Sequence, residues 1–68
     1  MANSDRPIII EKYANRGLYN TGTFTFVTLD ELAAMMKRGK NFLVYDSKTG
    51  ADITQSVQAQ IAFEQENS

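Results

Sequence analysis

The chain has 68 residues, a formal net charge of −1, and neither Cys nor His. Its length allows one small domain, and its composition excludes a disulfide and argues against a structural metal site. It has no apolar run long enough for a membrane helix or a signal peptide, so we expect a soluble cytoplasmic protein that binds no cofactor.

Two strands are predicted in the first half of the chain. Residues 1–6 are polar and predict a disordered tail, so the domain is expected over residues 7–66. Pro7 precedes three consecutive isoleucines, and β-branched residues favour a strand that runs to Tyr13. Residues 14–23 are rich in turn formers and predict a loop. The alternation over residues 23–27 predicts a second strand that buries Phe24 and Phe26 on one face.

A helix follows directly. Thr28 and Glu31 have the spacing of a capping box, in which each side chain accepts a hydrogen bond from the other residue's backbone amide. Gly39 is a typical residue to end the helix. One apolar face is formed at helical spacing by Leu29, Leu32, Ala33 and Met36.

The second half predicts one strand and one further helix. Residues 41–46 form a short apolar run, residues 47–50 a turn, and Asp52 or Thr54 can cap the helix. The helical pattern continues to the end of the chain, so we expect a fragment of a longer protein. The predicted fold is a small α+β domain of order β-β-α-β-α, with a short antiparallel sheet packed on two helices. Its predicted core comprises Ile8, Ile10, Leu18, Phe24, Phe26, Leu29, Leu32, Met36, Phe42, Val44, Ile53, Val57 and Ile61.

Catalysis is not expected from this chain. Without His or Cys, the acid–base candidates are mainly carboxylates, and those have structural roles in capping and turns. No glycine-rich phosphate loop is present, because the sequence around Gly22 lacks the Lys-Ser/Thr ending of a P-loop.

Basic residues fall in two groups that are candidates for nucleic-acid contacts. The first mixes cations, amides and aromatics, which suits phosphate and base-edge contacts, and consists of Lys12, Asn15, Arg16, Tyr19 and Asn20. The second surrounds the end of the first helix and consists of Lys37, Arg38 and Lys40. Composition alone favours a structural turn for the first group, and helix capping explains the second.

Several segments together resemble the N-terminal domain of polyhydroxyalkanoate synthesis repressors. They are Lys12-Tyr13-Ala14-Asn15-Arg16, Leu18-Tyr19-Asn20-Thr21, Val27-Thr28-Leu29, Val44-Tyr45-Asp46, Lys48-Thr49-Gly50, Asp52-Ile53-Thr54 and Ser56-Val57. The resemblance runs from about Ile8 to Glu66. It implies a bacterial repressor whose N-terminal domain binds double-stranded DNA upstream of granule-protein genes. It also implies that a region absent from this chain binds the polyester granule.

The sequence departs from the family pattern at four positions. The family typically has a second arginine where Gly17 stands, tyrosine at Phe26, arginine at Gln55 and leucine at Gln58. Two missing cations predict weaker DNA affinity, and Gln58 could weaken a contact made by the second helix.

Two hypotheses follow for the function. The first is a DNA-binding module that uses both basic groups. The second is an oligomerisation or interaction module with little DNA affinity of its own, which the pI near 5.1 and the small core favour. In either case we expect a homodimer, because a partner would cover the apolar stripe that ends at Ile61 and Phe63.

Overall fold

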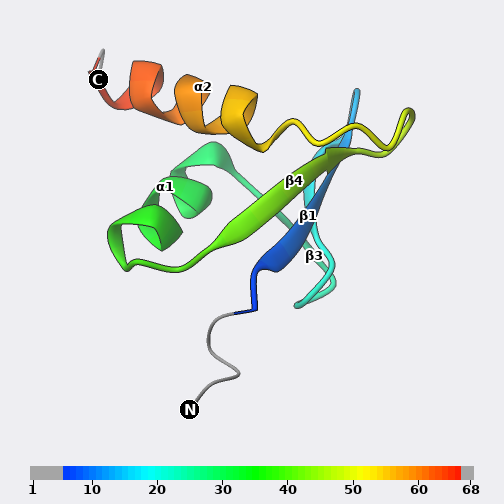
Figure 1. Ribbon diagram of the computed structural model, residues 1–68, viewed down its shortest axis with the longest axis horizontal. Coiled ribbons are helices and arrows are strands. Elements are labelled where there is room, and N and C mark those ends of the chain that lie inside the picture. The colour runs from blue at the N-terminus through cyan, green and yellow to red at the C-terminus, as the bar shows by residue number, and fades with distance from the viewer. Residues whose placement is uncertain (1–5, 67–68) are drawn as a thin grey trace.

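The computed structural model describes residues 6–66, which form a four-stranded mixed sheet and two helices (Figure 1). The strands are β1 (Ile8–Tyr13), β2 (Gly17–Asn20), β3 (Thr25–Val27) and β4 (Phe42–Asp46), and the helices are α1 (Leu29–Lys37) and α2 (Thr54–Glu66). The strand order is β3-β2-β1-β4, in which β1–β2 and β2–β3 pair antiparallel and β1–β4 pair parallel. The predicted α+β class is therefore confirmed.

The two faces of the sheet differ because side chains alternate along each strand. Ile10 on β1, Leu18 on β2 and Val44 on β4 point to one face and are buried. They form a single core with Leu32 of α1 and Val57 of α2. Both helices lie on this side of the sheet (Figure 1), and the opposite face carries no helix in the described part of the chain.

Helix α1 forms as its local sequence predicts. The Thr28 hydroxyl accepts from the Glu31 amide at 3.2 Å, and Glu31 Oε1 accepts from the Thr28 amide at 2.8 Å, which completes the capping box. The helix ends before Gly39, whose φ of +76° is a conformation that glycine adopts without steric cost. The periodic residues Leu32 and Ala33 are buried, whereas Met36 is 39% exposed.

Helix α2 is tied to β4 through Thr54. The Thr54 hydroxyl accepts from the Val44 amide at 2.8 Å and donates to Asp52 Oδ1 at 2.6 Å. The same Asp52 oxygen accepts from the Thr54 amide at 2.9 Å. The Thr54 side chain and backbone thus stabilise the Asp52 carboxylate and lower its pKa.

Three details of the predicted fold are wrong. The predicted loop 14–23 contains β2, so the order is β-β-β-α-β-α. The sheet is not purely antiparallel, because α1 crosses over and returns β4 parallel to β1. Phe24 and Phe26 are 76% and 52% exposed, because β3 begins at Thr25 and turns Val27, not the phenylalanines, toward the core.

The terminal predictions have mixed outcomes. Most of the predicted disordered tail, residues 1–5, lies outside the described residues. Ile61 is only 3% exposed in the single chain, so the helix does not need a partner to cover it, whereas Phe63 is 65% exposed. The dimer therefore remains a prediction.

Candidate nucleic-acid interface

The β1–β2 turn displays the first basic group. Tyr13 pairs with Gly17, which leaves a loop of residues 14–16 closed by the Arg16 amide donating to the Tyr13 carbonyl at 2.8 Å. Gly17 follows this loop with a φ of +100°, a backbone conformation that glycine adopts without steric cost. Asn15 and Arg16 are exposed at this tip. The hairpin therefore presents an amide and a guanidinium to solvent.

A third cation, which sequence reasoning missed, lies beside this tip. Lys12 pairs in register with Asp46, and the Ser47 amide donates to the Lys12 carbonyl at 3.0 Å. The turn of residues 47–50 therefore begins alongside the end of β1, and it carries the exposed Lys48. We call Lys12, Arg16 and Lys48 the hairpin-end cations.

Asn20 has a role within the fold. Its side chain is 5% exposed, and its Oδ1 accepts from the Gly22 amide at 2.7 Å and from the Thr23 amide at 3.2 Å. These bonds close the turn between β2 and β3. A buried amide oxygen that is already engaged by two donors is poorly placed to contact DNA, so we leave Asn20 out of the proposed interface.

Tyr19 belongs to an aromatic cluster on the uncovered face of the sheet. Its ring packs edge-to-face against Phe26, with centroids 5.0 Å apart, and against Tyr13 at 6.2 Å. Tyr13 and Phe26 complete the triangle at 6.4 Å. These three rings and Arg16 line a surface hollow of about 250 Å³.

Comparison with known proteins assigns the chain to a family. Residues 9–68 match the PHB/PHA accumulation regulator DNA-binding domain. The chain belongs to this family. It is 42% identical over 64 residues to an uncharacterized protein of Allochromatium vinosum and 41% identical over 64 residues to an uncharacterized protein in the phbA 5′ region of Thiocystis violacea. Each alignment covers 94% of this chain, but only 40% and 45% of the two relatives. No solved structure matches.

The family assignment makes the chain a DNA-binding domain of a PHB accumulation regulator, and this family is regulatory rather than enzymatic. Within residues 6–66, neither helix has the length and apolarity needed to cross a bilayer. In the same residues, acidic side chains do not gather in threes as a metal site would require.

In this PHB/PHA regulator domain the second basic group lies apart from the first. Lys37, Arg38 and Lys40 precede β4, whereas the hairpin-end cations lie where β1 and β4 finish (Figure 1). The Ile8–Phe42 and Lys12–Asp46 pairs mark the two levels, and the four residue steps along the strand from one pair to the other span roughly 13 Å. The two basic groups are thus at opposite ends of the parallel strands.

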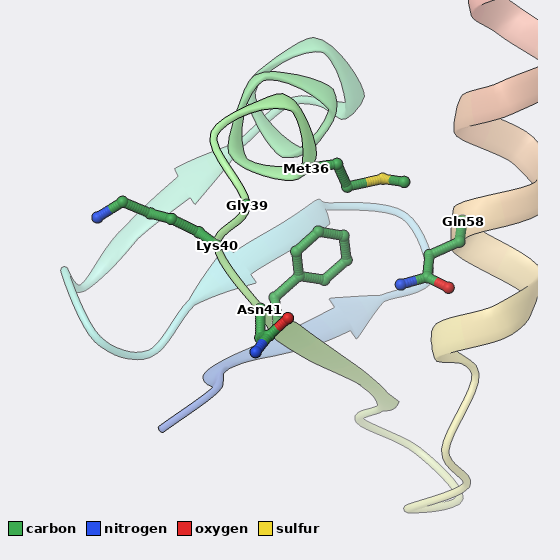
Figure 2. A pocket seen from close by; sticks show the side chains of 6 residues that line it. Met36, Gly39, Lys40, Asn41 and Gln58 are labelled. Carbon is green, nitrogen blue, oxygen red and sulfur yellow. The ribbon is translucent and has the colours of Figure 1, made fainter. Parts of the chain in front are cut away.

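The second group borders a hollow between the helices. Met36 of α1, Gln58 of α2 and Phe42 of β4 line this hollow. Figure 2 shows the side chains of Met36 and Gln58 extending toward each other, while Lys40 extends away from them. Phe42 is buried and Gln58 is partly buried. The hollow therefore lies where α2 packs against α1 and β4, and Lys40 contributes to its border while its side chain extends away from Met36 and Gln58.

Proposed function

We propose that the chain is the DNA-binding part of a transcriptional repressor that acts in the bacterial cytoplasm on promoters of polyhydroxyalkanoate granule-protein genes. The observation that carries the proposal is that Lys12, Arg16 and Lys48 all lie at the same end of the sheet in a member of this DNA-binding family. The net charge of −1 means that attraction to DNA must come from such a local cluster.

The exposed side chains divide by chemistry. The hairpin-end cations contact phosphates, because Lys and Arg supply most of the sequence-independent affinity for DNA. Asn15, at the tip of the same hairpin, reaches a base edge, where an amide can pair with adenine. Tyr19 contributes to DNA binding through its ring, which lines the aromatic hollow.

Lys37, Arg38 and Lys40 act as auxiliary phosphate contacts. These residues lie near the end of the sheet where β4 begins. That end is roughly 13 Å or more from the hairpin end, a span of about four base pairs along a duplex. A single domain lying along the duplex would use both basic groups, and the hairpin-end cations would make the main contacts. Polyester binding belongs to a region of the regulator outside this chain.

A mobility shift at low salt with DNA from upstream of a granule-protein gene tests the proposal. Arg16→Ala should weaken binding roughly 10-fold, because it removes a charge-assisted phosphate contact. Gln60→Ala, an exposed change on α2, should bind like the parent chain. Equal binding by the two variants would remove Arg16 from the interface.

A second candidate is an oligomerisation module with little DNA affinity of its own. Two observations favour it: the basic groups lie at opposite ends of the sheet, and Phe63 at the end of α2 is 65% exposed. A dimer would also present two hairpin ends to a paired DNA site. Sedimentation equilibrium at tens of micromolar tests self-association, and a dimer should also raise the unfolding midpoint as protein concentration increases. A dimer that does not shift the promoter DNA at low salt would favour this second candidate.

A further inference from the structure

The hollow on the uncovered face combines aromatic rings with a cationic side chain. A turn with a purely structural role does not require both. Three aromatic rings form one wall, and two of them, Tyr13 and Phe26, are 38% and 52% exposed. Arg16 forms part of the rim. The ligand that fits must therefore carry both a flat apolar surface and a negative charge.

The geometry of the hairpin holds this combination in place. Tyr19 and Phe26 are directly opposite on paired strands, so their rings meet without a flexible segment between them. Arg16 is held next to Tyr13 by its backbone bond to the Tyr13 carbonyl. The site is thus preformed by two antiparallel pairings and one tight turn.

The size of the hollow limits the ligand to about one ring system. Pockets for drug-sized molecules begin at roughly 300 Å³, and this hollow of about 250 Å³ is open to solvent and slightly smaller. Aromatic side chains stack nucleobases whatever their identity, and an arginine beside them pairs with the adjoining phosphate.

We propose that this hollow accepts one unstacked nucleobase, so that the domain prefers DNA with an unpaired or easily unstacked base at the position facing the hairpin. This inference rests on the proposed function, because it places the base beside a phosphate held by Arg16, which lines the hollow. Phosphate contacts by Lys12, Arg16 and Lys48 fix the register, and the rings then read deformability rather than base identity.

The experiment compares three probes of one sequence by fluorescence anisotropy at low salt: a perfect duplex, the same duplex with one unpaired thymine, and the single strand. We expect the parent chain to bind the duplex with the unpaired base about tenfold more tightly than the perfect duplex. Phe26→Leu, which keeps apolar bulk but removes the aromatic face, should abolish this preference. Phe26→Tyr should keep it.

Matched controls separate the inference from the proposed function. Phe24→Leu makes the same change at an exposed ring outside the hollow, and it should leave the preference intact. Arg16→Ala should weaken binding to all three probes. If the perfect duplex is bound but the unpaired base gives no gain, the inference is wrong and the proposed function stands. If only the probes with unpaired bases are bound, the inference stands and duplex recognition by this chain fails.

Two other results would also overturn the inference. If Phe26→Leu leaves the preference unchanged, the rings do not hold the base. Alternatively, Phe26→Leu disrupts self-association in sedimentation while the preference persists, which assigns the aromatic face to a second copy of the chain. Circular dichroism of each variant confirms that the sheet and helices are retained.

Discussion

The two faces of one sheet have different roles in this domain. The face under α1 and α2 holds Ile10 and Val44 with no exposed surface, whereas the opposite face leaves Phe26 52% exposed. Both faces carry large apolar side chains, so composition does not distinguish them. One set is buried and stabilises the fold, whereas the other is accessible to solvent and ligands. The difference teaches that the strand register, rather than residue type, decides which aromatic residues are available for binding.

The largest expected effect tests the covered face. Leu32→Ala removes a fully buried side chain and should lower the free energy of unfolding by about 2–5 kcal/mol. Phe26→Leu on the open face should cost less than about 1 kcal/mol, because half of that ring is already in water. Urea denaturation measures both changes in the free energy of unfolding. Comparable losses would show that the side chains on the open face also stabilise the fold.

A cation added at the hairpin end should be the next largest effect. Gly17→Arg places a side chain at a φ of +100° and should cost about 1–2 kcal/mol of stability, although nothing lies within 4 Å of the added Cβ. It should also raise the slope of log affinity against log salt by about one, through one further phosphate contact.

Gly39→Arg is the matched control for that change. Gly39 has a φ of +76° and the same open surroundings, so the backbone cost is similar, but it lies at the opposite end of the sheet. The salt slope for DNA should change less than for Gly17→Arg. An equal change would mean that the two ends contribute alike to DNA binding.

A smaller gain is expected beneath α2. Gln58 lines the same hollow as Met36 and Phe42 (Figure 2), so Gln58→Leu replaces an amide with an apolar side chain beside two apolar ones. The variant should be about 1 kcal/mol more stable to urea. Gln60→Leu, which is exposed on the same helix, should leave the urea midpoint unchanged.

The smallest effect concerns the link between β4 and α2. The pKa of Asp52 is lowered by its bonds from Thr54, so the charged carboxylate stabilises the folded chain above the unfolded pKa of about 3.9. That contribution is lost as the pH falls through the lower folded value. Asp52→Asn should therefore be slightly less stable than the parent at neutral pH, and the difference in urea midpoint should vanish in acid. A difference that does not change with pH would exclude this charge effect.

The elements that depend on near neighbours were predictable. Thr28 and Glu31 are three residues apart, so the start of α1 is encoded in one helical turn. Strand β2 was missed because Leu18 and Tyr19 are only a short apolar pair between two turns. The fold class and the family likeness were confirmed, and the candidate contacts at Lys12, Asn15 and Arg16 remain predictions.

The features that depend on distant pairing were not predictable in the same way. Period-two alternation predicted that Phe24 and Phe26 share the buried face. It did not indicate that the strand starts at Thr25 and that Val27 packs against the core. Lys48 was overlooked because its position beside Lys12 requires β4 to run parallel to β1. Asn15 and Asn20 are both candidate base contacts by residue type. They differ in burial, which the sequence does not reveal: Asn20 is buried and Asn15 is exposed.

The parallel pairing of β1 and β4 also has a consequence for the order of folding. Ile8 and Phe42 are paired across 34 positions of chain, whereas β1, β2 and β3 are joined by short turns. Closing the long connection costs more chain entropy before its contacts are made. We therefore expect the three antiparallel strands to associate early and β4 to dock in the rate-limiting step, so that substitutions at Val44 would slow folding more than substitutions at Val27.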